Sequence, residues 1–92
     1  MYTVSHSKNF KKALKKNERS GQHSIQEIRD VVFLIASGAK LAEKYQDHQL
    51  QGKMSENREC HIKADLLLVY QIKKDKLVLL LINIGNHSSL FK

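Results

Sequence analysis

The chain has 92 residues, with 16 Lys and Arg against nine Asp and Glu and a single cysteine, Cys60, so its formal charge is +7. This length predicts one domain over residues 1–92, because a second hydrophobic core would not fit. The cysteine count excludes an internal disulfide. Met1–His6 lacks the apolar segment of a signal peptide, and the longest apolar run, Leu77–Ile82, is too short to span a membrane. We therefore expect a soluble cytoplasmic protein whose positive charge favours nucleic acid or another polyanion as partner.

The N-terminal segment predicts a short strand and a basic helix. Polar and apolar residues alternate over Tyr2–Ser5, and Ser7 is placed to cap a helix that runs to about Glu18. Five lysines follow helical spacing along it: Lys8, Lys11, Lys12, Lys15 and Lys16. This stripe is either a solvated face without a ligand or a surface that binds phosphates or an acidic protein.

A second helix is expected after Ser24. Ser24 and Glu27 match a capping box, in which each side chain accepts a hydrogen bond from the other residue's backbone amide. The apolar residues that follow are dense enough to pack on a sheet, and Gly38 is expected to end the helix.

The second half of the chain predicts a sheet. Residues 39–57 look like a polar connection with one helical turn around Leu41–Tyr45. Strands are then expected over Arg58–Ile62, Leu66–Ile72 and Leu77–Ile84, joined by short turns. Such turns imply an antiparallel meander. The helices would cover one of its faces, which gives an α+β fold.

Three histidines, His48, His61 and His87, each lie in a short polar segment beside an apolar strand-like one. Imidazole exchanges protons near neutrality, because its unperturbed pKa is about 6.5. The end of the third strand lies beside the start of the second, so His87 and Asp65 can approach each other near His61. A three-residue loop would place Asp65 on the face of His61, where it could orient the imidazole; a two-residue loop would oppose them. We predict acid–base catalysis by these four residues; the alternative is that each histidine is structural.

Other chemistry is less favoured by the sequence. Cys60 and the histidines could bind zinc, but Cys60 and His61 are adjacent on a strand and point to opposite faces, and no CxxC, HxH or HExxH spacing occurs. We expect no metal and no cofactor. Cys60 should pack in the core rather than act as a nucleophile. Phe91 either caps the core or stacks on a base of RNA beside His87.

At these residues the chain resembles the YafQ branch of the RelE-type bacterial toxins. The family's Tyr-Lys-Asp-His-x-Leu-x-Gly matches Tyr45–Gly52, its Arg-Asp/Glu-x-His-x-x-x-Asp matches Arg58–Asp65, and its Gly-Ser/Thr-His-x-x-Leu-Phe matches Gly85–Phe91. The resemblance covers the whole length and implies two N-terminal helices packed on a curved antiparallel sheet.

The resemblance also implies an activity. These proteins are endoribonucleases of type II toxin–antitoxin systems that cleave mRNA in the ribosomal A site. A cognate antitoxin neutralises them and often joins them on operator DNA. By resemblance His87 is the general acid, and His61 or His48, helped by Asp65, acts on the 2′-hydroxyl. Arg58 and Phe91 would contact RNA.

Two positions depart from the family pattern. Leu66 replaces an aromatic residue that could stack on a base, and Asn83 replaces an arginine that could stabilise the transition state. The rival hypothesis is a non-enzymatic protein of the same fold, either a ParE-like toxin that inhibits gyrase by binding or a co-repressor that only binds antitoxin. Such a protein would need no histidine cluster.

Overall fold

The computed structural model describes residues 1–21 and 24–90, and its elements follow one another along the chain without long gaps. They are β1 (Thr3–His6), α1 (Lys8–Ser20), α2 (Ile25–Ala36), the 3-10 turn η1 (Glu43–Tyr45), β2 (His48–Gln49), the 3-10 turn η2 (Gly52–Met54), β3 (Arg58–Lys63), β4 (Leu66–Lys73), β5 (Val78–Gly85) and α3 (His87–Leu90). The predicted α+β fold is confirmed. None of the helices within the described ranges is long and apolar enough to cross a bilayer.

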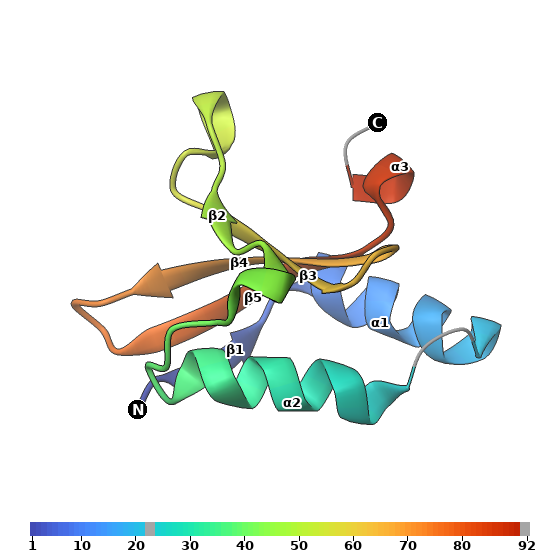
Figure 1. Ribbon diagram of the computed structural model, residues 1–92, viewed down its shortest axis with the longest axis horizontal. Helices are drawn as coiled ribbons and strands as arrows, with labels where there is room; N and C mark the ends of the chain where they lie inside the picture. Colours follow the sequence, from blue (N-terminus) through green and yellow to red (C-terminus); the bar gives the residue numbers. More distant parts are fainter. Residues whose placement is uncertain (22–23, 91–92) are drawn as a thin grey trace.

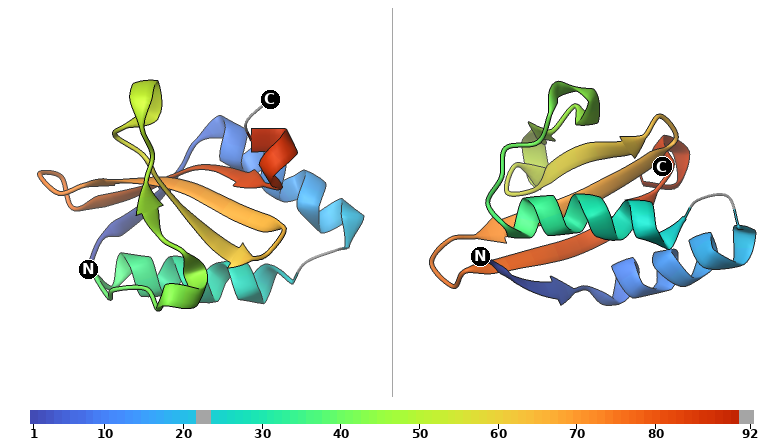
Figure 2. Two further views of the ribbon diagram at one scale, coloured as in Figure 1. Left: turned by 45° about the horizontal axis from the view of Figure 1, so that its top comes forward. Right: turned by 60° about the horizontal axis from the view of Figure 1, so that its bottom comes forward.

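The strands of the described residues form one five-stranded sheet in the order β1-β5-β4-β3-β2. Figure 1 shows α1 and α2 on one side of this sheet, whereas β2 with its loop and α3 rise from the other side at opposite ends. α1 contacts β5, and α2 contacts β3. Figure 2 shows α2 lying across the strands and α1 continuing from β1 along the edge of the sheet. The sheet therefore has one face covered by the long helices and one face flanked by β2 and α3.

The predicted meander of β3, β4 and β5 is antiparallel, as expected. The expected strand at the N-terminus lies one residue later, at Thr3–His6, and pairs in parallel with Val78–Leu81 of β5. The sheet is therefore antiparallel except for this parallel pair at its edge. The sequence also missed β2, because two polar residues cannot show a strand pattern; His48 and Gln49 become a strand by pairing with Glu59 and Arg58.

Local hydrogen bonds explain where the helices begin and end. The Ser7 hydroxyl accepts from the Phe10 amide at 3.0 Å and so caps α1. The Ser24 hydroxyl accepts from the Gln26 amide at 3.1 Å and caps α2. Both halves of the predicted capping box are wrong, because the Ser24 hydroxyl accepts from Gln26 rather than from Glu27, and the Glu27 carboxylate pairs with Lys63 of β3 at 2.9 Å. A contact with the neighbouring sheet thus replaces the local one.

Gly38 ends α2 as predicted. Its φ of 85° lies in the left-handed region, which glycine enters without a steric penalty. The Gly38 amide donates to the Ile35 carbonyl at 3.0 Å, and the Ala39 amide donates to the Leu34 carbonyl at 3.2 Å. These two bonds form a Schellman motif, which satisfies carbonyls that the helix leaves open.

The hydrophobic core lies between the sheet and the two long helices. Its buried members are Phe10, Ile28, Val31, Ile35, Ala36, Cys60, Leu66, Leu68, Tyr70, Leu79, Leu81 and Ile84. Because side chains alternate along a strand, these residues identify the strand positions that face the helices. The intervening positions face the other side of the sheet, where the candidate site lies.

Candidate functional site

Two neighbouring rows of residues cross the sheet on the face away from the long helices. Residues directly opposite each other in an antiparallel pair point to the same face. One row is His48, Glu59, Val69 and Asn83, and the next is His61, Leu67 and Gly85. Cys60 and Leu68, which lie between them in sequence, belong to the core on the helical side. The sheet register therefore brings two of the predicted histidines to one face.

Glu59 lies between these histidines and is 4% exposed. Its Oε1 is 3.6 Å from Nε2 of His48 and 3.7 Å from Nε2 of His61. Its Oε2 is buried and has no hydrogen-bond partner among the described residues. Burying a carboxylate without full hydrogen bonding costs stability. A buried acid between two more exposed imidazoles makes this cluster the candidate functional site.

The orientation of His48 is fixed on its other side. Nδ1 lies 2.7 Å from the carbonyl oxygen of Gln46. A carbonyl oxygen only accepts hydrogen bonds, so Nδ1 carries a proton in this arrangement. Nε2 is then the ring nitrogen that faces Glu59.

His87 and Asp65 lie at one end of the sheet. His87 is the first residue of α3 and is exposed, and it follows Gly85, which shares a row with His61. Asn86 holds this turn, because its Oδ1 accepts from the Ser89 amide at 2.8 Å and its carbonyl accepts from the Leu90 amide at 3.1 Å. The short helix therefore presents His87 at the end of the sheet nearest His61.

Asp65 lies in the turn between β3 and β4 rather than on a strand. Lys63 pairs with Leu66, and the register is irregular between His61 and Lys63. Neither of the two predicted loop geometries applies, since Asp65 is itself a turn residue. The carboxylate that lies beside His48 and His61 is that of Glu59. Asp65 instead lines a cavity beside α1 and α3.

Arg58 lies on the opposite face of the sheet from Glu59 and pairs with Asp47. Its Nη2 donates to Oδ2 of Asp47 at 2.8 Å and its Nε donates to the same atom at 3.3 Å. The hydroxyl of Tyr70 donates to Oδ1 of Asp47. The hydrogen bond with Asp47 raises the pKa of Arg58 further. Burial, together with the hydrogen bond to Asp47, raises the pKa of the Tyr70 phenol. This cluster joins the segment before β2 to the sheet and so supports the position of His48.

The remaining expectations have mixed outcomes. Cys60 is fully buried, and burial raises its pKa to about 12, which confirms its predicted place in the core. Leu66 is also buried in the core, and Oδ1 of Asn83 accepts from the Ile84 amide at 2.9 Å. Phe91 lies outside the described residues. Within residues 1–21 and 24–90, no group of three or more His, Cys, Asp or Glu side chains could hold a metal ion.

The sequence reasoning missed Glu59. The signal was present, because Glu59 and His61 are two residues apart on a predicted strand and therefore share a face. Glu59 follows Arg58 directly, and two adjacent residues of opposite charge usually mark a solvated surface. The sequence therefore did not indicate that Glu59 is buried beside a histidine.

The family follows from comparison with known proteins. Residues 2–92 match the family model described as the bacterial toxin of type II toxin-antitoxin systems, YafQ. This chain belongs to the YafQ toxin family. The predicted resemblance is therefore confirmed over nearly the whole chain.

Individual YafQ relatives and solved toxin structures are also similar to this chain. The putative toxin YafQ of Haemophilus influenzae is 42% identical over 40 residues, which span 44% of this chain and 39% of that protein. A metal-bound toxin from Helicobacter pylori is 45% identical, with a TM-score of 0.90 and coverage of 99% of this chain and 100% of that one. YafQ in the Escherichia coli DinJ-YafQ complex is 26% identical, with a TM-score of 0.87 and complete coverage of both chains, 100% each.

Proposed function

We propose that this YafQ-family toxin is a ribosome-dependent endoribonuclease that cleaves mRNA in the A site and thereby inhibits translation in the cytoplasm. The observation that carries the proposal is the buried Glu59 carboxylate between Nε2 of His48 and Nε2 of His61, on the sheet face that α3 and His87 flank. Proton-transfer groups on a basic chain suit the chemistry of a phosphodiester.

The proposed reaction needs a base, an acid and positive charge. His61 or His48 takes the proton of the 2′-hydroxyl, and the 2′-oxygen attacks the adjacent phosphorus. The bond from phosphorus to the 5′-oxygen breaks, and His87 donates a proton to that oxygen. The products are a 2′,3′-cyclic phosphate and a 5′-hydroxyl. Glu59 orients the two imidazoles, which is the role that the sequence predicts for Asp65.

The roles of the other predicted residues stay proposals. Asp65 lies at the same end of the sheet as α3, where it can act on RNA or on the turn that carries His87. Arg58 supports the site through Asp47 and is 35% exposed as a side chain, so one edge of its guanidinium remains available to a phosphate. Phe91 is proposed to stack on a base.

A cognate antitoxin is the proposed protein partner. The support is membership of a family of type II toxins and the solved E. coli complex of YafQ with DinJ. Binding of operator DNA would then be a property of the toxin–antitoxin complex. A gyrase-binding or purely co-repressing protein remains the rival, and no described residue favours it specifically.

Mapping the 5′ ends of mRNA after brief induction tests the activity. We expect new 5′-hydroxyl ends at fixed positions within codons, because the A site sets the register of cleavage. Ends that appear only when translation is running would support dependence on the ribosome. Growth arrest without any new ends would overturn the nuclease proposal and favour the rival.

Glu59→Gln should lower the cleavage rate about 100-fold, because a small displacement of catalytic groups commonly costs that much. The change removes the charge between His48 and His61 but keeps the shape of the side chain. Single-turnover cleavage on programmed ribosomes measures the effect, and thermal melting checks the fold. Glu56→Gln is the matched control, since Glu56 is exposed in the loop before β3. Equal rates for the two variants would remove the proposed positioning role of Glu59.

A further inference from the structure

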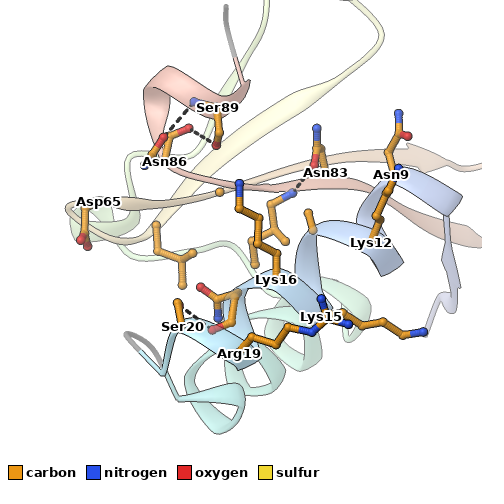
Figure 3. Close-up of a pocket in the computed structure, with 15 residues that line it drawn as sticks. Asn9, Lys12, Lys15, Lys16, Arg19, Ser20, Asp65, Asn83, Asn86 and Ser89 are labelled. Atoms are coloured by element: carbon orange, nitrogen blue, oxygen red, sulfur yellow. Dashed lines mark hydrogen bonds between the residues drawn. The ribbon is translucent and has the colours of Figure 1, made fainter.

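A cavity of about 890 Å³ lies between α1 and the end of β5, beyond the histidine rows. Figure 3 shows its lining, with Lys16 extending from α1 toward the strand and turn that carry Asn83 and Asn86. Its lining combines lysine and arginine side chains of α1 with amide side chains of β5 and of the turn that follows it. Its volume is within the roughly 300–1,000 Å³ range of ligand pockets, which leaves room for about two nucleotides.

The charge of this cavity is strongly positive. Lys12, Lys15, Lys16 and Arg19 line it from one helix, and Asp65 is the only carboxylate among the lining residues that the structure describes. These cations are part of the stripe predicted from the sequence, extended by Arg19. Because they are three or four residues apart they repel one another, and an anion between them would relieve that repulsion.

Amide groups add uncharged donors on the other wall. Oδ1 of Asn83 accepts from the Ile84 amide, and Oδ1 of Asn86 accepts from the Ser89 amide. Each of these oxygens keeps a second lone pair, and each side chain also has an NH₂ group that can donate to a ligand. Nδ2 of Asn17, which also lines the cavity, is buried without a hydrogen-bond partner among the described residues. The cavity thus combines cations with amide groups that can donate hydrogen bonds, which match the oxygens of a phosphate.

The cavity is continuous with the turn that carries the proposed general acid. Gly85, Asn86 and Ser89 line it, and His87 lies within this same segment. A Cβ at Gly85 would collide with Oγ of Ser89, so this turn is closely packed and its position is well fixed. A chain that occupied the cavity would therefore lead directly to His87.

We propose that this cavity binds the sugar-phosphate backbone of single-stranded RNA on one side of the cleaved bond. The proposal rests on the proposed nuclease function and adds a binding site for the flanking nucleotides. An acidic segment of a protein partner would also meet the cations, but continuity with His87 favours the substrate strand. The cavity would set how the strand is held, while the histidine face carries out the reaction.

The test is binding of a fluorescent nine-nucleotide RNA of mixed sequence, 2′-O-methylated throughout so that it cannot be cleaved, to the full chain. Lys12→Gln/Lys16→Gln should raise Kd roughly tenfold and reduce the slope of log K against log salt by about 1.4, or about 0.7 per lost phosphate contact. The matched control is Lys74→Gln/Lys76→Gln, which removes the same charge from the exposed turn at the far end of β5.

Three outcomes would overturn the proposal. The first is an unchanged Kd for the cavity variant. The second is an equal loss of RNA affinity in both double variants, which would indicate an effect of net charge alone. The third is weakened antitoxin binding with unchanged RNA binding, which would assign the cavity to the protein partner. Circular dichroism confirms that both variants fold. Failure of the nuclease proposal would appear separately, as absence of cleavage by the unmodified chain, because the probe is not cleaved in this experiment.

Discussion

His87→Ala should lower the rate of mRNA cleavage by about 100- to 10,000-fold, the contribution expected of a group that transfers a proton in the transition state. RNA affinity should change little, because the lost interaction forms mainly as the 5′-oxygen departs. Folding should also persist, since His87 is exposed at the start of α3 and lies outside the hydrophobic core. Single-turnover cleavage on programmed ribosomes, with RNA binding measured in parallel, separates the two effects.

His6→Ala is the matched control for this experiment. His6 is exposed at the end of β1, where its ring lies 5.5 Å from that of Phe10. β1 is at the opposite edge of the sheet from β2. The substitution therefore removes the same chemical group, an imidazole, from a position far from the candidate site. Full activity of the His87 variant would exclude His87 as the general acid. An equal loss in both variants would point to a general effect on folding.

Asp47→Ala should lower the free energy of unfolding by about 2–3 kcal/mol, measured by urea denaturation. Most of this cost comes from the Tyr70 hydroxyl, which is left without its acceptor in a side chain that is only 2% exposed. The bond with Arg58 should contribute less, because these side chains are 35% and 22% exposed and solvent weakens their attraction. His48 follows Asp47 directly, so cleavage should fall as well.

Two variants show whether that interpretation is correct. Asp75→Ala removes a carboxylate from the exposed turn between β4 and β5 and should change stability by less than about 0.5 kcal/mol. Tyr70→Phe removes only the hydroxyl and should cost less than the loss of Asp47, because it leaves no buried donor unpaired. If Asp47→Ala were as stable as Asp75→Ala, the cluster would have no structural role.

Most of the secondary structure could be predicted because it depends on local pattern. Ser7 and Gly38 mark helix ends through bonds within a few residues, and the alternating strands of the meander reveal their own faces. Glu27 was read wrongly because a lysine on β3, distant in sequence, binds it in place of its own helix end. The alternation of residues predicts β1 as a strand, but no residue near it in sequence specifies that it pairs in parallel with β5.

The candidate site was harder to predict, because its geometry depends on register. The irregular pairing between His61 and Lys63 changes which residues share a face beyond that point, and no residue there marks it. Asp65 lies in the turn, whereas Glu59 precedes the irregular pairing and shares the face of His61 because the two are two residues apart on β3. The histidines themselves could be found because imidazoles beside strand ends are chemically distinctive wherever the strands pair.

The pairing of β1 with β5 has a consequence for synthesis of the toxin. Thr3 lies opposite Val78, and the hydroxyl of Ser7 donates to the carbonyl of Ile82 at 2.6 Å, across 75 positions of sequence. A growing chain cannot form these bonds until β5 has been translated and has left the ribosome. The β5 strand that anchors the N-terminal helix also leads straight into the turn bearing His87. The N-terminal strand should therefore stay unpaired during synthesis until β5 has emerged, and the part of the sheet that leads to His87 should be completed no earlier.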